Sequence, residues 1–143
     1  METTGLLAAA RELGVAVVAY SPLGRGMLSG TFSARSELTE GDWRLTQPRW
    51  SEALAAENFA KAAALKAVAD RKGCSTAQLA LAYLLSKGAF PIPGTTKAAR
   101  AVENLRAADI ALAAADVAEL EALVPEAGGD RYEGGWGQFE KRM

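Results

Sequence analysis

Histidine is missing from this sequence altogether. The commonest general base and metal ligand of proteins is therefore unavailable to the chain. A serine–histidine–aspartate triad and a zinc site of the usual composition are both excluded. We accordingly expect no metal site.

Cysteine, charge imbalance and long apolar runs are scarce as well. The single cysteine, Cys74, cannot form an internal disulfide and fits a reducing compartment. The 16 basic and 17 acidic residues nearly cancel, which gives no electrostatic reason to expect nucleic acid or an anionic membrane as a partner. No apolar run approaches the roughly 20 residues of a membrane span, and residues 1–5 lack the basic start of a secretory signal. We therefore expect a soluble, cytoplasmic protein.

The spacing of apolar residues predicts about five helices and two strands in a single domain, residues 1–143. Thr3 or Thr4 can cap the first helix, and Ser75 with Gln78 forms a capping box at the third. The glycine-rich residues 126–143 are expected to form a flexible tail. The predicted helices cover residues 6–13, 51–72, 76–86, 97–106 and 114–124.

The two predicted strands are short and lie far apart in the chain. Residues 15–20 are apolar without alternation, which is typical of a fully buried strand in a parallel sheet. Residues 90–92 form the second strand, which Pro91 and Pro93 keep short because proline donates no ladder hydrogen bond. A buried strand needs neighbours on both sides, so the sequence indicates part of a larger α/β fold.

The segment after the second strand has the properties of a phosphate site. Gly94 allows a sharp turn, and Thr95 or Thr96 can cap the next helix, which leaves its first N–H groups pointing out of the turn. Lys97 and Arg100 lie three residues apart and are expected on one face of the first helical turn. A helix N-terminus beside two cations suits a phosphate.

The first strand is also followed by a loop suited to a ligand. Residues 21–30, Ser-Pro-Leu-Gly-Arg-Gly-Met-Leu-Ser-Gly, contain glycines that let a ligand approach the backbone closely. Ser21 and Arg25 add a hydroxyl and a cation. The irregular stretch that follows, residues 31–50, is long enough to be functional or disordered, and its tryptophans argue against disorder.

These motifs resemble those of the aldo-keto reductase family. Residues 17–30 are similar to the seventh strand of its barrel with the following loop, and residues 42–59 carry Asp-Trp-Arg, Pro-Arg-Trp and Glu-Asn-Phe as in the later part of that loop. Residues 76–85 resemble the seventh helix. Residues 91–104 resemble the last strand and the cofactor-binding helix, and residues 129–132, Gly-Asp-Arg-Tyr, have parallels in the family's tail.

The resemblance implies the C-terminal part of a (β/α)8 TIM barrel, helix-rich, with two short parallel-type strands. It implies an NADPH-dependent oxidoreductase that reduces aldehydes and ketones by hydride transfer. Such barrels commonly hold a phosphate between the loops after strands seven and eight. The implied cofactor residues are Ser21, Leu23, Gly24 and Gly26 at the pyrophosphate, Gly94, Thr95 and Thr96 at the adenosine phosphate, Lys97 and Arg100 at the 2′-phosphate, and Glu103 and Asn104 at the adenine.

The catalytic part of the family's pattern is missing from the match. The family's tetrad is an aspartate, a tyrosine, a lysine and a histidine, and the resemblance places all four upstream of the segment matched here. Tyr20, Tyr83 and Tyr132 do not align with the catalytic tyrosine. A full barrel needs about 250 residues. We therefore expect a fragment-like chain without catalytic residues, whose partner is the missing N-terminal barrel half or a second copy.

Each feature taken alone has a commoner structural explanation, and a second function stays open. The alternative function is a non-catalytic nucleotide-binding, oligomerising or regulatory module, in which self-association covers the strand edges. The commoner explanations are a solvated helix start for residues 96–100, turns for Gly24 and Gly26, packing for Trp43 and Trp50, and an unreactive thiol for Cys74, although a helix start can lower a thiol pKa.

Overall fold

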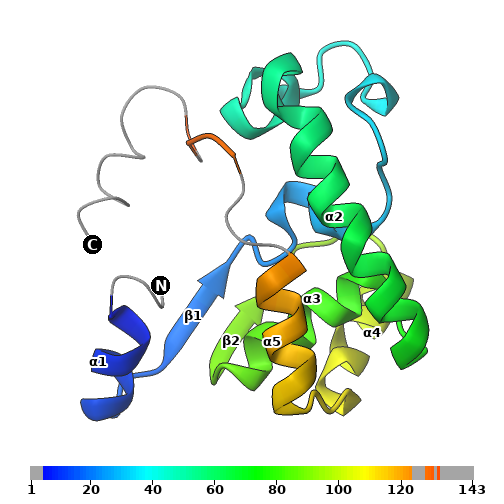
Figure 1. Ribbon diagram of the computed structural model, residues 1–143. Coiled ribbons are helices and arrows are strands. Elements are labelled where there is room, and N and C mark those ends of the chain that lie inside the picture. Colours follow the sequence, from blue (N-terminus) through cyan, green and yellow to red (C-terminus); the bar gives the residue numbers. More distant parts are fainter. Residues whose placement is uncertain (1–4, 124–127, 131, 133–143) are drawn as a thin grey trace.

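The computed structural model describes residues 5–123, 128–130 and 132. Its strands and α-helices appear in the order that the sequence predicted (Figure 1). They are α1 (Leu6–Glu12), β1 (Val17–Tyr20), α2 (Glu52–Lys72), α3 (Thr76–Ser86), β2 (Ala89–Ile92), α4 (Ala98–Leu105) and α5 (Ala114–Leu123). Short 3₁₀ helices are η1 (Gly24–Ser29), η2 (Arg35–Glu37), η3 (Trp43–Thr46), η4 (Pro48–Trp50) and η5 (Arg106–Asp109).

The two strands form a parallel sheet, which confirms the predicted strand direction. Val17 pairs with Ala89 at one end of the register and Tyr20 with Ile92 at the other. Because parallel strands end at the same edge of a sheet, the loops after β1 and β2 begin side by side. This pairing brings the two predicted ligand-binding segments together.

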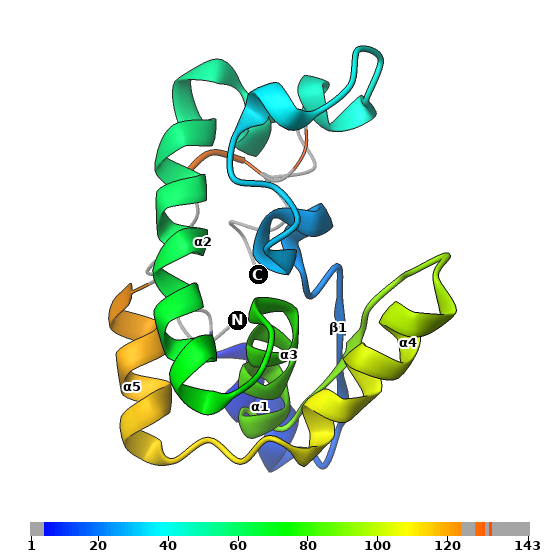
Figure 2. The same ribbon diagram turned by 90° about the vertical axis from the view of Figure 1, so that its right-hand side faces the viewer.

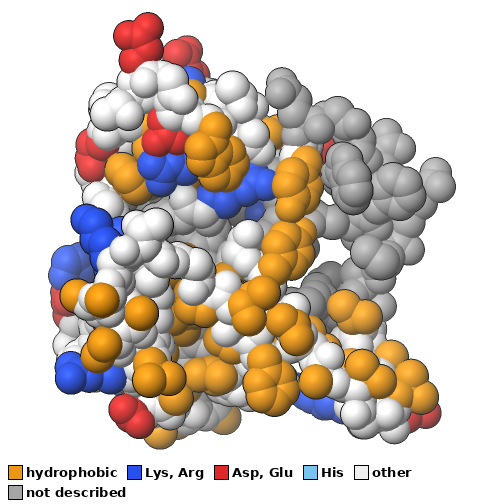
Figure 3. All heavy atoms as spheres, turned by 180° about the vertical axis from the view of Figure 1, so that it is seen from behind, with side chains coloured by type: hydrophobic (Ala, Val, Ile, Leu, Met, Phe, Trp, Pro, Cys, Tyr) orange, Lys and Arg blue, Asp and Glu red, His pale blue; other side chains and the backbone are white. Residues whose placement is uncertain are grey.

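The expectation that the first strand is fully buried is wrong for this chain. Val18 is 58% exposed and its neighbour across the ladder, Phe90, is 59% exposed, whereas Ala19 and Ala89 are buried. The sheet has only these two strands in the described part of the chain, so neither of its edges pairs with a further strand there, and the face that carries Val18 and Phe90 is exposed. Seen from behind, apolar side chains spread over the lower half of the molecule (Figure 3).

The hydrophobic core is organised along α2. The first half of this helix packs against the long loop, and the second half packs against α3 and α5, while α3 lies between α2 and α4 (Figure 2). Leu28, in the loop after β1, contacts both parts of the core. The first part consists of Met27, Leu38, Trp50, Ala55, Phe59 and Ala62, and the second of Leu65, Val68, Ala69, Leu79 and Leu120.

The predicted capping box at the start of α3 is confirmed. Ser75 Oγ accepts a hydrogen bond from Gln78 N at 3.2 Å, and Gln78 Oε1 accepts one from Ser75 N at 3.0 Å. Ser75 Oγ also donates to Glu103 Oε1 at 2.5 Å, and Gln78 Nε2 donates to the Glu103 carbonyl at 3.0 Å. The cap thus satisfies the helix end and fixes α4 against α3.

Some predictions about the chain ends fall beyond the described residues. Thr3 and Thr4 lie outside them, and α1 is instead preceded by Gly5 with φ 73°. The tail, residues 126–143, is described only at 128–130 and 132. Burial raises the pKa of the Cys74 thiol, which agrees with an unreactive residue. No helix in the described part is long and apolar enough to cross a membrane.

Replacing Ser75 by alanine should lower the free energy of unfolding by about 1–2 kcal/mol, because the cap is lost together with the bond to Glu103. Ser51→Ala is the matched control, since Ser51 precedes α2 without a side-chain capping bond. Its effect should stay within about 0.5 kcal/mol. Urea denaturation measures both, and equal losses in the two variants would contradict the assignment.

Candidate functional site

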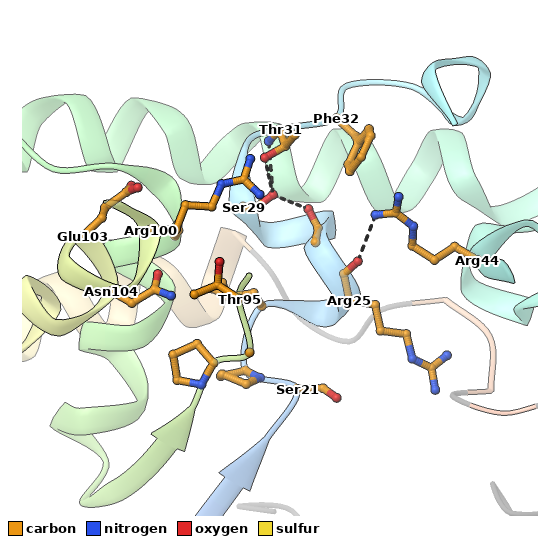
Figure 4. Close-up of a pocket in the computed structure, with 16 residues that line it drawn as sticks. Ser21, Arg25, Ser29, Thr31, Phe32, Arg44, Thr95, Arg100, Glu103 and Asn104 are labelled. Carbon is orange, nitrogen blue, oxygen red and sulfur yellow. Dashed lines mark hydrogen bonds between the residues drawn. The ribbon is translucent and has the colours of Figure 1, made fainter. Parts of the chain in front are cut away.

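A pocket of about 540 Å³ lies where the chain leaves β1 and β2 (Figure 4). Its walls come from the loop after β1, the turn after β2, the start of α3 and the inner side of α4. Of the residues predicted to bind a cofactor, those lining it are Ser21, Leu23, Gly26, Gly94, Thr95, Arg100, Glu103 and Asn104. Gly24, Thr96 and Lys97 are not part of its lining.

We call residues 21–30, the loop after β1, the glycine loop. Several of its residues have positive φ. Gly24 and Gly26 have φ of 58° and 99°, and the non-glycine residues Ser21 and Arg25 also have positive φ, 47° and 61°. Such conformations are costly for residues with a Cβ atom, and surrounding contacts must hold them in place. One of these contacts is buried Met27, which fixes the loop to the core.

Arg44 packs directly against this loop from the long segment that follows it. Its Nη1 donates to the Arg25 carbonyl at 3.3 Å, and a Cβ atom at Gly26 would lie only 3.2 Å from the same nitrogen. The guanidinium also lies 4.4 Å from the ring centroid of Phe32 and 5.1 Å from that of Trp50. Glycine at position 26 therefore permits this close approach.

Asp42 fixes the orientation of Arg44. Its carboxylate accepts from Arg44 Nε at 3.0 Å and from Arg44 Nη2 at 2.6 Å, and it also accepts from the Arg44 backbone N–H at 3.0 Å. These bonds favour the ionised carboxylate and lower the pKa of Asp42 to about 2. Arg44 lines the pocket as one half of a tight ion pair.

Arg25 does not present its charge to the pocket in the way the sequence suggested. Its Nη1 donates to Gln47 Oε1 at 2.6 Å. Its guanidinium carbon lies 5.2 Å from the ring centroid of Trp43 and 4.7 Å from that of Tyr132. In Figure 4 the side chain points away from Arg100. Arg25 therefore serves mainly to hold the loop.

The start of α4 differs from the prediction. Lys97 is the N-cap residue, with φ −109° and ψ 118°, and makes no side-chain capping bond. Thr95 Oγ1 accepts from Lys97 N at 3.1 Å, so this threonine forms a turn before the helix instead of capping it. Lys97 therefore lies before the first helical turn and does not line the pocket, whereas Arg100 does.

Arg100 is the cation that the pocket leaves available. It makes no ion pair or hydrogen bond with any residue in the described part of the chain. Its side chain extends from α4 toward Ser29 and Thr31 of the opposite wall (Figure 4). Ser29 Oγ bonds the Gly26 carbonyl at 2.6 Å and Thr31 Oγ1 at 2.9 Å. An anion between these walls would meet a guanidinium and hydroxyl groups.

The remaining polar residues lie on the next turn of α4. Glu103 lines the pocket with one carboxylate oxygen held by Ser75. Asn104 lies beside it, and Figure 4 shows its amide directed toward Thr95. A carboxylate and an amide side by side suit the recognition of an amino-bearing heterocycle.

Several lining residues were not predicted as site residues. Phe32 and Arg44 belong to the long irregular segment, where only the Asp-Trp-Arg triplet gave a signal. Ser29 lies at the end of the glycine loop and Thr31 directly after it, and neither residue carried a signal of its own. Ala77 reaches the pocket because the capping box places the start of α3 there.

Comparison with known sequences supports the resemblance. The model of the Aldo/keto reductase family matches residues 1–125. Similar proteins include "Aldo-keto reductase str7" of Strobilurus tenacellus, 40% identical over 85% of this chain and 37% of the relative. "Aldo-keto reductase yakc [NADP(+)]" of Schizosaccharomyces pombe is 34% identical over 93% of this chain and 40% of its own. The chain thus spans about two fifths of these relatives.

Solved structures give the same result for the fold. The thermostable aldo-keto reductase Tm1743, solved with the inhibitor epalrestat, matches 85% of this chain and 34% of its own with a TM-score of 0.56 and 28% identity. The glycerol dehydrogenase AKR11B4 from Gluconobacter oxydans matches 89% of this chain and 39% of its own, with a TM-score of 0.71 and 17% identity. At 17% identity, the match to the glycerol dehydrogenase supports the fold of this chain and nothing about its function.

The chain therefore belongs to the aldo-keto reductase family. Its fold is that of part of a (β/α)8 barrel, helix-rich and with two parallel strands, as the sequence predicted. The predicted family and fold class are confirmed. The glycine loop and the turn after β2 occupy the same edge of the sheet, as the loops after neighbouring barrel strands do.

The ion pair between Asp42 and Arg44 should make stability depend on pH in acid. The pKa of the Asp42 carboxyl falls from about 3.9 in the unfolded chain to about 2 in the folded chain. The stabilisation is therefore complete above about pH 4 and is lost as the pH falls from 4 toward 2. Asp42→Asn should be less stable at pH 7, and the difference between the two proteins should shrink at pH 2. Urea midpoints from pH 2 to 7 measure this, and a constant difference would contradict it.

Proposed function

We propose that this chain binds NADPH and forms the adenosine and pyrophosphate site of an aldo-keto reductase that reduces aldehydes or ketones. The observation that carries the proposal is the position of Arg100. It is a cation without an ion-pair partner in the described part of the chain, and it lines a pocket formed by the two loops at one edge of a parallel sheet. Ligands bind at this edge in parallel α/β folds.

The residues of the pocket fit the chemistry of the cofactor. Its volume of about 540 Å³ lies within the range usual for small-molecule sites. Arg100 offers the planar fork that suits a phosphate, and Glu103 and Asn104 lie where an adenine amino group can be met. The glycine loop supplies close backbone approach for the pyrophosphate, through Gly26 and Leu23.

The choice of NADPH over NADH rests on the cation at the adenosine end. A 2′-phosphate adds charge that Arg100 can neutralise, whereas a bare 2′-hydroxyl gains little from it. A similar protein carries NADP(+) in its name. Lys97 is a secondary contributor, since it lies next to the turn but outside the pocket lining.

The chain's own residues bind and orient the cofactor and do not carry the reaction. NADPH, when bound, supplies a hydride for reduction of a carbonyl group. The family's aspartate, tyrosine, lysine and histidine tetrad has no counterpart in the motifs matched here, and the sequence has no histidine. The carbonyl substrate and the general acid therefore belong to the missing barrel part, which is the partner that we propose.

The alternative function, a non-catalytic module that associates with itself, has one observation in its favour. The open face of the sheet exposes Val18, Tyr20, Phe90 and Ile92, each at 48% or more. A second copy can cover such a surface as well as a barrel half can. Nucleotide affinity separates the proposed function from a module that only associates with itself, because only the proposed function requires Arg100.

Arg100→Ala should weaken NADPH binding by roughly ten- to hundredfold and NADH binding by less than threefold, since a charged hydrogen bond to the 2′-phosphate is lost. Lys97→Ala should weaken NADPH binding less. Lys66→Ala is a matched control, since Lys66 forms an exposed ion pair with Asp70 on α2. Titration of NADPH fluorescence measures the affinities. Equal losses for NADPH and NADH would contradict the assigned 2′-phosphate contact.

The purified chain should bind NADPH without oxidising it in the presence of an aldehyde. The measurement is absorbance at the cofactor's near-ultraviolet band over hours, with a range of aliphatic and aromatic aldehydes. Aldehyde-dependent oxidation that persists in Arg100→Ala at saturating cofactor would place catalytic groups within this chain and overturn this part of the proposal.

A further inference from the structure

We propose that Gly128, Gly129 and Tyr132 act as a clasp on the glycine loop. In this arrangement Asn58 anchors the clasp to α2, and Tyr132 holds Arg25, so that the loop keeps the backbone shape on which the pyrophosphate rests. Asn58 and Tyr132 are thus positioning residues that do not line the pocket. The ligand in this inference rests on the proposed function, whereas the contact between clasp and loop does not.

The anchor is the buried side-chain amide of Asn58, which hydrogen-bonds to the backbone of two separate segments. Asn58 is 2% exposed. Its Oδ1 accepts from Gly128 N at 2.8 Å, and its Nδ2 donates to the Gly128 carbonyl at 3.1 Å and to the Arg49 carbonyl at 2.9 Å. A buried amide that lost these partners would be left unsatisfied. Asn58 therefore hydrogen-bonds both the N–H and the carbonyl of Gly128, as a neighbouring strand would.

Two glycines let the segment lie close to α2. A Cβ atom at Gly129, which has φ 86°, would come within 2.6 Å of Leu54 Cδ1. A Cβ atom at Gly128 would lie 3.3 Å from Leu54 Cδ2. The Gly129 carbonyl accepts from Arg49 Nε at 3.2 Å, which adds a second tie to the same region. These contacts hold Gly128 and Gly129 against the start of α2.

From this anchor Tyr132 reaches the glycine loop. Its ring centroid lies 4.7 Å from the guanidinium carbon of Arg25, and its hydroxyl lies 3.5 Å from that of Tyr20 at the end of β1. Trp43 and Gln47 contact the same guanidinium. A cation held over aromatic rings and by an amide has little freedom to move.

Fixing Arg25 matters because of its backbone. Its φ of 61° is unfavourable for a residue with a side chain, and Gly26 follows it with φ 99°. Its carbonyl also accepts from Arg44, so both its side chain and its main chain are held. Loss of Tyr132 removes one of these restraints, and the peptide between residues 25 and 26 becomes freer to leave the shape that lines the pocket.

The test uses the full chain with Tyr132→Ala, the conservative Tyr132→Phe, Asn58→Ala and the double variant. Tyr132→Ala should weaken NADPH binding roughly three- to tenfold, as expected for loss of a cation–π contact, and should speed amide hydrogen exchange in η1. Tyr132→Phe, which keeps the ring, should restore both to within about twofold. Adenosine 2′,5′-bisphosphate, which lacks the pyrophosphate bridge, should bind Tyr132→Ala as it binds the wild type.

The anchor predicts a further relation between the variants. Asn58→Ala should weaken NADPH binding in the same direction, and the double variant should bind no more weakly than the weaker single variant, because both substitutions act through one contact. Fully additive losses would overturn the clasp. So would equal weakening of NADPH and the bisphosphate in Tyr132→Ala, or η1 exchange and NADPH affinity that do not change.

The same measurements separate this inference from the proposed function. If the wild-type chain binds neither NADPH nor the bisphosphate, the proposed function fails, and η1 exchange in Tyr132→Ala and Tyr132→Phe still decides whether the clasp holds the loop. If the wild-type chain binds both ligands but the Tyr132 variants exchange and bind as it does, the clasp alone is overturned.

Discussion

Parallel pairing of β1 with β2 is the constraint on which the rest of the site depends. The paired strands come from opposite sides of α2 and α3 in the sequence, and their register, Tyr20 with Ile92 at the carboxyl ends, makes the two loops begin at one level. An antiparallel arrangement would send the glycine loop and the turn before α4 to opposite edges. No helix cap or cation in either segment could then serve a common ligand.

Three arginines line the pocket, and the structure uses them differently. Arg44 is paired with Asp42 and Arg25 is held by Gln47 and aromatic rings, so both mainly support the backbone of the glycine loop. Arg100 has no such partner in the described part of the chain. A phosphate placed in this pocket, as we propose, would meet one cation that no described residue pairs with, while the other two arginines support the surrounding backbone. Composition alone does not distinguish these roles.

Some features determined by neighbouring residues were predictable from the sequence, whereas features determined by distant residues were not. The capping box at Ser75 depends on a few adjacent residues, so it was recognised correctly. The cap of α4 was wrongly assigned to Thr95 or Thr96, because Thr95 accepts the bond from Lys97 N in a turn before the helix. The role of Arg25 depends on its contacts with the rings of Trp43 and Tyr132, and no local sequence pattern indicates these contacts. The exposure of the sheet was predicted wrongly because the apolar composition of a strand indicates the kind of fold that it is suited to. It does not indicate which neighbouring elements are present.

The open face of the sheet and the pocket can be considered separately. The pocket's walls are held by contacts within this chain: the glycine loop by Met27 and Arg44, and α4 by the bonds of Glu103 to the α3 cap. None of these contacts involves the exposed side chains of Val18 or Phe90. Whatever covers that face, a barrel half or a second copy, need not supply any of the pocket's supporting bonds. In the function that we propose, cofactor binding and barrel completion are therefore separate properties, because the contacts that support the pocket lie within the described residues.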